Sequence, residues 1–414
     1  MKSFSESWAY YSPYYPAAPY EGSTRKSCAV SQVNILQRHG ARYPTSRATR
    51  AITTALAKLQ SVAKYNDTKL DFLNNYIYGL GKNDLVQYGA DQSSSLGAET
   101  FRRYKHLVAG ANNLPFIRAS GSKRVILSAQ SWAKGFSAAG EALYPAKVNL
   151  IIPETHGSNN TLDNGMCPTA VNTETQVKRF VDITFEDIAA RLNSGAPGAN
   201  LTAQDAYAIM HLCPFDTVAK EAVSPFCKIF SEEDFETYEY AGDLGKFYNT
   251  GYGSPLGAVQ GVGYVNELIG RLTNSPAHHS LQTNSTLLSS PDTFPLNRTI
   301  YADFSHDNLI IAVLSAMGLF NQTNGPLDTT RIVKDRTWIA SKMVPFSGHM
   351  TVEGLSCSTH PTQYVRVFVN DARQPLHFCG ADSDGMCKLE EFVKSQEYAR
   401  NDGFGDFAAC AYEG

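Results

Sequence analysis

The sequence has no apolar segment long enough to cross a membrane, which takes about 18 or more consecutive apolar residues. The longest apolar stretch, residues 309–320, is interrupted by Ser315 and Gly318. Residues 1–20 also lack the apolar centre of a secretory signal peptide. We therefore expect a protein without a membrane span, either cytosolic or already freed of its signal.

Charged residues are scarce, at 18% of the 414 residues, below the roughly 25% that is usual. Lys and Arg number 36 and Asp and Glu 39, which gives a net charge of −3. This balance argues against a nucleic-acid-binding chain, which would be clearly basic. Hydrophobic residues make up 43%, so we expect a folded chain with a large core, long enough for two domains or one domain with an insertion.

Several enzyme motifs are missing. The sequence contains no G-x-S-x-G, which excludes the usual serine hydrolases. It has no P-loop, and its glycines at 251–263 lack dinucleotide-binding spacing. No pair of cysteines has zinc-site spacing. We expect neither a metal ion nor another cofactor.

Cysteines and glycosylation sequons instead point to the secretory pathway. The eight cysteines are an even number, and they fit disulfides better than eight buried free thiols. They allow about 105 pairings, which spacing alone leaves open. Six N-x-S/T sequons predict N-linked glycans, at Asn66, Asn159, Asn200, Asn284, Asn297 and Asn321. We expect a secreted, extracellular protein.

The chain reads as an α/β protein with a mainly helical insertion. Three expected strands each lead through a polar junction into an expected helix. The strands are 33–37, 124–128 and 299–304, and the helices that follow them are 48–62, 130–143 and 308–317. Residues 136–275 have mostly helical patterns, such as 177–192 and 203–212, and residues 364–370 alternate as a strand. We expect an α/β domain from 1–135 and 276–414, with 136–275 inserted. The Tyr- and Pro-rich residues 8–20 predict an extended arm on the surface.

The first chemical motif is RHGARYPT at residues 38–45. Arginine binds phosphate oxygens through a planar fork of donors and stays charged at any working pH. Between Arg38 and Arg42, a neutral His39 could attack phosphorus, because nearby positive charges disfavour its protonated form. The alternative, an ordinary basic surface loop, is equally compatible with this motif alone.

The second motif is SHDN at residues 305–308, where a strand ends and a helix begins. His306 could donate to a phosphate oxygen, and Asp307 could protonate a leaving alkoxide as a general acid. An ordinary helix cap is the alternative. Ligands of open α/β sheets bind at the carboxyl ends of the strands, so both motifs and Arg124 are expected to meet in one pocket.

RHGARYPT and SHDN together resemble the histidine acid phosphatases, and most closely the secreted fungal phytases. The resemblance extends from Trp8 to Cys410 through WAYYSPYY, IIPETHGSNNTLDNGMC and CGADSDGMC. It implies the histidine phosphatase fold, also called phosphoglycerate mutase-like, with a mixed sheet flanked by helices. A cytosolic phosphoglycerate mutase-like enzyme fits less well, since it would lack these cysteines and sequons.

The resemblance also implies roles for single residues. His39 would be the nucleophile that becomes phosphohistidine, and Asp307 the proton donor. The phosphate ligands would be Arg38, Arg42, Arg124 and His306. Candidate substrate-contacting residues are Thr45, Arg47 and Lys69. The implied disulfides are Cys28–Cys357, Cys167–Cys410, Cys213–Cys227 and Cys379–Cys387.

The expected function is hydrolysis of phosphomonoesters by a secreted acid phosphatase. The resemblance implies phytate, myo-inositol hexakisphosphate, as the small-molecule substrate, with attack first at the 3-position. A broad-specificity acid phosphatase is the main alternative. A non-catalytic, secreted polyphosphate-binding glycoprotein fits less well, because both His39 and Asp307 are present. We expect no nucleic-acid or membrane partner.

Overall fold

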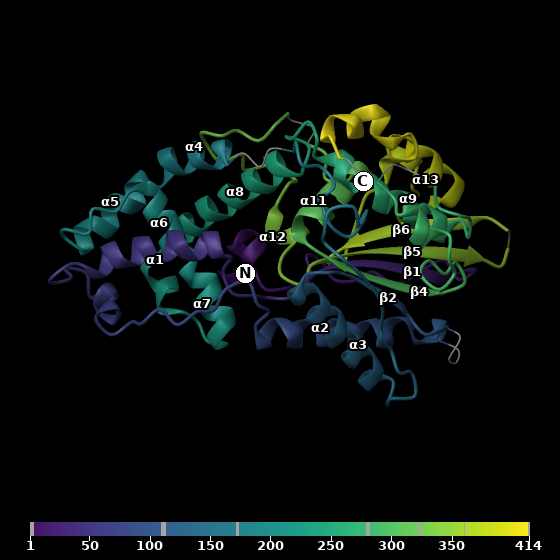
Figure 1. The fold of residues 1–414 in the computed structure, drawn as a ribbon, viewed down its shortest axis with the longest axis horizontal. Helices are drawn as coiled ribbons and strands as arrows, with labels where there is room; N and C mark the ends of the chain where they lie inside the picture. Colours follow the sequence, from purple (N-terminus) through teal and green to yellow (C-terminus); the bar gives the residue numbers. More distant parts are fainter. Residues whose placement is uncertain are drawn as a thin grey trace.

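The computed structural model describes residues 4–108, 113–170, 174–278, 282–322, 325–359 and 361–412. One mixed sheet forms its centre, in the strand order β3-β2-β4-β1-β5-β6-β7, with β8 paired to β6 (Figure 1). The strands are β1 Cys28–Arg38, β2 Phe116–Ser120, β3 Val148–Ile152, β4 Ile300–Ser305, β5 His349–Cys357, β6 Gln363–Val369, β7 Ala372–Arg373 and β8 Cys387–Lys388. The expected mixed sheet flanked by helices is confirmed.

The four strands from β3 to β1 are parallel, and this determines where the site lies. Arg38 at the end of β1 pairs with Ser305 at the end of β4. The carboxyl ends of all four strands therefore meet at one edge of the sheet. Each of these strands is followed within a few residues by one of the polar junctions discussed below.

Helices cover both faces of the sheet. In Figure 1, α2 and α3 lie on one face, and α9, α11 and α13 lie on the other. Trp132 and Phe136 of α3 pack on Phe304 and Ile117, within a buried cluster of β1, β2 and β4. These helices are α2 Gln87–Tyr104, α3 Lys123–Ala139, α9 Val262–Leu272, α11 Asp307–Ala316 and α13 Leu389–Ser395.

A second group of helices lies beside the carboxyl edge of the sheet, at the left of Figure 1. Helices α4 to α8 fall within residues 136–275, as does strand β3, while α1 packs against α6 from outside that range. The members are α1 Ser46–Gln60, α4 Thr175–Thr184, α5 Glu186–Gly195, α6 Ala203–Met210, α7 Leu212–Lys220 and α8 Glu232–Asn249. Short helices α10 Ser285–Leu288, α12 Ala340–Met343 and α14 Glu397–Arg400 are the remaining α-helices of the described residues, which also contain several 3-10 helices.

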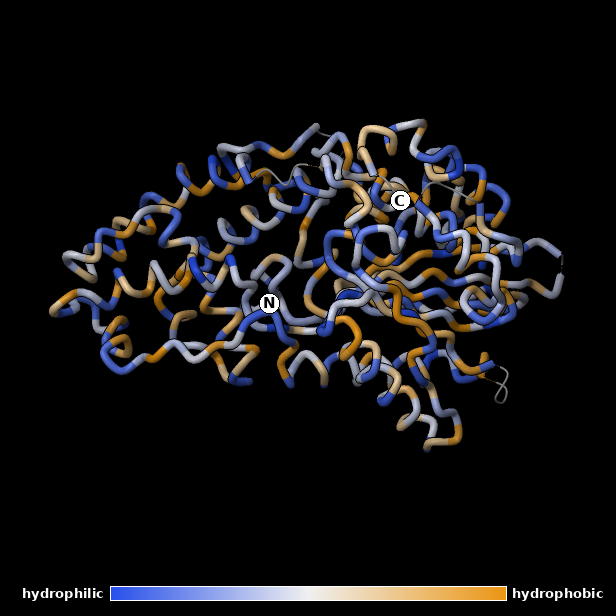
Figure 2. Tube along the Cα trace, viewed as in Figure 1, coloured by the Kyte–Doolittle hydropathy of each residue, from blue (hydrophilic) through white to orange (hydrophobic). Residues whose placement is uncertain are grey.

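Hydropathy follows this architecture: the central strands are largely hydrophobic, and the outer helices alternate between hydrophobic and hydrophilic residues (Figure 2). No helix among the described residues is long and apolar enough to span a membrane.

The predicted strand at 124–128 is wrong, because these residues form the first turns of α3. The strand lies earlier, at Phe116–Ser120, and all five of its residues are buried. Val125, Ser128, Ala129 and Trp132 are buried at helical spacing, and a short β-branched run cannot reveal this alone. One helix predicted at 177–192 is two, because α4 ends at Thr184 and α5 begins at Glu186.

The prediction of an extended surface arm at 8–20 is wrong for residues 8–12, whereas residues 13–20 form neither helix nor strand and are at least partly exposed. Ala9–Tyr11 form a 3-10 turn, and Trp8, Ala9 and Tyr11 are buried in the core. The Ser12 carbonyl oxygen accepts a hydrogen bond from the N–H of Phe346. Aromatic burial thus outweighs the preference of the nearby prolines for an extended chain.

Candidate active site

The candidate nucleophile His39 lies directly after β1, in a backbone held from both sides. Its N–H donates to the carbonyl oxygen of Ser305 at the end of β4 (3.0 Å). Its own carbonyl oxygen accepts from the N–H of Ser347 (3.0 Å). The ring therefore projects from a fixed point at the carboxyl edge of the sheet.

Glycine is required next to His39 by close backbone packing. The Gly40 N–H donates to the Ser128 hydroxyl at 2.9 Å. A Cβ atom on Gly40 would lie 2.2 Å from the carbonyl oxygen of Gly89 at the start of α2. No side chain fits in that space, so glycine lets the loop lie against the helix.

The His39 ring is prepared to act as a nucleophile. Its Nδ1 lies 2.8 Å from the carbonyl oxygen of Gly40, which can only accept, so Nδ1 carries the proton and the Nε2 lone pair is left available. Burial lowers the pKa of His39 well below its usual range, and the charges of Arg38, Arg42 and Arg124 lower it further. Both effects favour the neutral imidazole.

Arg38 is fully buried and oriented by the N-terminal arm. Its Nη1 donates to the carbonyl oxygens of Tyr10 and of Val344, the latter at 2.7 Å. Its guanidinium lies 4.7 Å from the centre of the Phe346 ring. Burial lowers the pKa of Arg38 to about 10, which still leaves it a cation below neutral pH.

Arg42, in the loop that carries His39, and Arg124 are both close enough for their charges to act on His39. Arg42 donates from Nη1 to the carbonyl oxygen of Tyr43 (2.9 Å). Arg124, in the first turn of α3, has its Nη2 3.3 Å from Nδ1 of His306. The Nε atoms of Arg38, Arg42 and Arg124 are buried without a hydrogen-bond partner among the described residues. These donors suit an anion with several oxygens.

Asp307 opens α11 and is held between two cations. Its Oδ2 lies 3.0 Å from Nη2 of Arg38 and 2.9 Å from Nζ of Lys246. Burial would raise the pKa of Asp307, but the charges of Arg38 and Lys246 lower it well below its usual range. The side chain is thus a carboxylate in this state.

Sequence reasoning missed two residues of this cluster. Lys246 lies in α8, where nothing in the local sequence distinguishes it from other helical lysines, and its Nζ also donates to Oδ1 of Asn308 (2.7 Å). Glu154 follows β3, and its Oε1 lies 2.8 Å from Nε2 of His306. Recognising 148–152 as a strand would have suggested Glu154, because it stands at the carboxyl end.

The candidate substrate-contacting residues lie further from these contacts. Thr45 caps α1 by accepting from the N–H of Ala48 (3.3 Å). Arg47 is exposed and paired with Glu174 at 2.5 Å. Lys69 is exposed in a 3-10 helix, and its N–H donates to Asp67. Their role in substrate binding stays a prediction.

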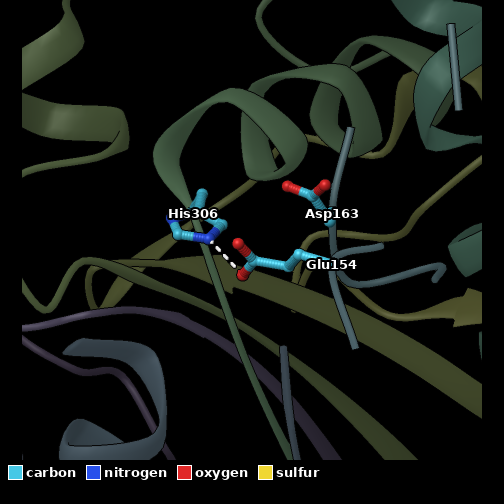
Figure 3. A group of neighbouring side chains, drawn as sticks. All are labelled: Glu154, Asp163 and His306. Atoms are coloured by element: carbon cyan, nitrogen blue, oxygen red, sulfur yellow. Dashed lines mark hydrogen bonds and ion pairs between the residues drawn. The ribbon is translucent and has the colours of Figure 1, made fainter. Parts of the chain in front are cut away.

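Three side chains could offer ligand atoms to a cation. Atoms of Glu154, Asp163 and His306 lie within 4.8 Å of one another (Figure 3). The hydrogen bond between Glu154 and His306 already joins two of them.

All four implied disulfides are confirmed, and no cysteine is free. They are Cys28–Cys357, Cys167–Cys410, Cys213–Cys227 and Cys379–Cys387. Four sequon asparagines are exposed, namely Asn66, Asn200, Asn297 and Asn321. Asn159 and Asn284 are partly buried, and both side-chain carbonyls accept hydrogen bonds within the protein.

Comparison with known proteins decides the family. Residues 29–370 match the model of the histidine phosphatase superfamily, branch 2. The chain belongs to this family. The matched range contains His39, Arg124, Glu154, Lys246 and Asp307, so the whole cluster lies within it.

Named relatives of this histidine phosphatase are fungal. It is 39% identical to Phytase A of Aspergillus fumigatus over 419 residues, covering 96% of this chain and 89% of the relative. It is 40% identical to Phytase A of Emericella nidulans over 416 residues, with the same coverage.

Solved structures show the same fold. The crystal structure of the phytase from D. castellii covers 99% of this chain and 87% of its own, with 24% identity and a TM-score of 0.80. A Bifidobacterium longum multiple inositol polyphosphate phosphatase, in complex with inositol hexasulfate, covers 94% of this chain and 97% of its own. Its identity is 14% and its TM-score 0.63.

Proposed function

We propose that this histidine phosphatase hydrolyses phosphomonoesters through a phosphohistidine formed on Nε2 of His39. The observation that carries the proposal is the convergence of three arginine charges on the His39 imidazole, whose Nε2 lone pair is available. Arg38 and Arg42 are buried, and Arg124 is partly buried. Phosphoryl transfer depends mainly on positioning and on neutralising charge. This arrangement supplies both.

In the first step, Nε2 of His39 forms a bond to phosphorus as the ester P–O bond breaks. Arg38, Arg42 and Arg124 hold the phosphoryl oxygens. The alcohol leaves with a proton from Asp307 when its alkoxide is too basic to leave alone. In the second step, water attacks phosphorus, the P–N bond breaks, and the Asp307 carboxylate takes up the proton of the water.

Asp307 needs a proton before it can act as the acid, although it is ionised in the ligand-free state. The substrate phosphate supplies the reason for the change. Its negative charge competes with Asp307 for Arg38, whose Nη2 bonds the carboxylate at 3.0 Å. Losing that partner beside an anion favours the protonated carboxyl. Substrate binding would thus protonate Asp307 and make it a general acid.

Phytate is the proposed substrate, in line with the Phytase A relatives. A broad phosphomonoesterase is the second candidate, and one observation favours it. Arg47 is paired with Glu174, and Lys123 with Asp84 at 3.1 Å. Arg47 follows the first motif in sequence and Lys123 directly precedes Arg124. Pairing reduces the attraction of both cations for the outer phosphates of a polyanion.

Secretion and N-glycosylation are part of the same proposal. Four disulfides fit an oxidising compartment. The four exposed sequons are the expected glycan sites, because Asn159 and Asn284 are partly buried.

The test compares phosphate release from p-nitrophenyl phosphate and from phytate at about pH 5. Activity on both, with the higher kcat/KM on phytate, is expected. A higher kcat/KM on simple esters would favour the broad phosphomonoesterase. No release from either would contradict the proposed function.

A further inference from the structure

Glu154 connects the ends of three parallel strands. It follows β3, and its Oε1 accepts from the Ser120 hydroxyl at the end of β2 (2.6 Å) and from the N–H of Ser122 (3.0 Å). The same oxygen lies 2.8 Å from Nε2 of His306, which follows β4. Figure 3 shows the carboxylate facing the edge of the imidazole. The contact thus joins residues that lie at or just after the ends of three strands.

The two ring nitrogens of His306 face opposite charges. Nε2 faces Glu154, and Nδ1 lies 3.3 Å from Nη2 of Arg124. A guanidinium can only donate, so Nδ1 is the acceptor in this state and the proton is on Nε2. A phosphate that takes the donors of Arg124 would present an acceptor to Nδ1 instead. To bind that oxygen, Nδ1 must gain a proton, and the ring becomes an imidazolium.

Charged groups around His306 act in both directions. Arg124 does not favour a positive charge on His306, and neither does His39. The centres of the two histidine rings are 5.6 Å apart. Three carboxylates favour it: Glu154, Asp163 and the adjacent Asp307. Of these, Glu154 is the one in direct hydrogen-bond contact with the ring among the described residues.

Glu154 and Asp163 differ in their response to acid. Burial would raise the pKa of Glu154, but hydrogen bonds from His306, Ser120 and Ser122 lower it to about 2. Burial raises the pKa of Asp163, and the Glu154 charge adds to this effect. In acid, Glu154 is therefore the counter-ion that stays ionised.

We propose that Glu154 is a positioning residue that holds His306 as an imidazolium, so that Nδ1–H donates to the transferring phosphoryl group. The inference rests on the proposed function of this site and adds its pH dependence. His306 thereby acts as a further cationic phosphate ligand beside the three arginines. Glu154 does not touch the substrate and acts only through His306.

The decisive variant is Glu154→Gln, which keeps an acceptor oxygen but removes the charge. We expect the alkaline limb of the kcat/KM profile to move to lower pH by roughly one unit. Competitive inhibition by inorganic phosphate should weaken by about tenfold near neutral pH and change little in acid. A loss of activity equal at every pH would mean a structural role and would overturn the proposal, as would an unmoved profile.

Two further variants make the comparison specific. Asp163→Asn removes a charge from the same trio without removing the hydrogen bond to His306, and should move the alkaline limb less. Glu154→Asp keeps the charge, so the alkaline limb should lie closer to that of the unaltered protein than the limb of Glu154→Gln does. If Asp163→Asn moves the profile as far as Glu154→Gln, general electrostatics explain the effect and the positioning role is wrong.

A measurement that needs no ester hydrolysis can test this inference separately from the proposed function. In a His39→Ala background, the His306 ring can be followed by NMR while inorganic phosphate is added near neutral pH. Protonation of the ring on phosphate binding, lost in the added Glu154→Gln variant, is expected even if no ester is ever hydrolysed. An imidazole that stays neutral with Glu154 present would contradict the inference. Absence of phosphatase activity in the unaltered protein would contradict the proposed function alone.

Discussion

At the scale of single residues, side chains of the same charge lie in different surroundings in this site. Arg38 is held by carbonyl oxygens of the N-terminal arm and of the loop after α12. Arg124 instead begins a helix and contacts His306. Asp307 lies against Arg38 and Lys246 and is ionised before substrate arrives. A carboxyl group that gains its proton only in the substrate complex predicts a clear kinetic signature.

Asp307→Asn should slow phosphohistidine formation from phytate far more than from p-nitrophenyl phosphate. An inositol alkoxide needs a proton as it leaves, and p-nitrophenolate does not. General-acid help is worth roughly 10²–10⁴-fold where it is needed. The measurement is the single-turnover rate, since Asp307 also assists the later attack by water. Equal slowing of both esters would show that Asp307 only orients or caps.

Gly40→Ala tests the packing of the loop that carries His39. The added Cβ would lie 2.2 Å from the Gly89 carbonyl oxygen, so we expect a loss of about 1–3 kcal/mol in unfolding free energy and a large loss of kcat. Gly79→Ala is the matched control, because a Cβ there meets nothing within 4 Å. Similar effects of both substitutions on unfolding and on kcat would refute the packing role.

At the scale of elements, the N-terminal arm is part of the core and of the site. Trp8 is 1% exposed, and its backbone N–H donates to the Ser12 hydroxyl at 3.0 Å. Tyr10 supplies a carbonyl oxygen to Arg38, and its ring lies 4.3 Å from Nζ of Lys246. Loosening the arm should therefore affect both stability and phosphate binding.

Trp8→Ala is expected to lower the unfolding free energy by about 3–5 kcal/mol, as large buried aromatics do. It should also raise the inhibition constant of inorganic phosphate through Arg38. Phe404→Ala, at a residue that is 63% exposed, serves as the control in the same denaturant titration. A cost no larger than that of the control would mean that the arm is dispensable.

The elements also show what the sequence can predict. The strand predicted at 33–37 lies within β1, and the helix predicted at 308–317 coincides with α11 to within one residue. Residues 124–128 were misread, since a five-residue apolar run is compatible with either a strand or a helix. Lys246 could not be found at all, because only the fold brings α8 to Asp307. The domain boundaries at 135 and 275 stay predictions.

At the scale of the whole molecule, acid acts on stability through buried histidines. His211 packs among Tyr207, Phe215 and Tyr238. Burial lowers its pKa to about 4, partly opposed by its hydrogen bond to the Tyr207 carbonyl. In the unfolded chain His211 is protonated below about pH 6.5, whereas in the folded protein it is protonated only below about pH 4. Stability therefore falls as the pH decreases through that window.

We expect His211 to account for about 3 kcal/mol of this loss between about pH 6.5 and 4. His211→Phe, which keeps an aromatic ring in an aromatic setting, should flatten the dependence of unfolding free energy on pH. His377→Ala, at an exposed histidine, should leave the dependence unchanged. A His211→Phe profile parallel to that of the unaltered protein would contradict this account.

The central claim is that His39 carries the phosphoryl group, and the most direct measurement is to trap it there. The enzyme is mixed with p-nitrophenyl phosphate, quenched within one turnover in alkaline denaturant, and the peptide containing residue 39 is analysed by mass spectrometry. We predict a phosphoryl group on His39, none in the His39→Ala variant, and the same thermal unfolding for both proteins. An unmodified His39 during turnover, or full activity of His39→Ala, would contradict the account.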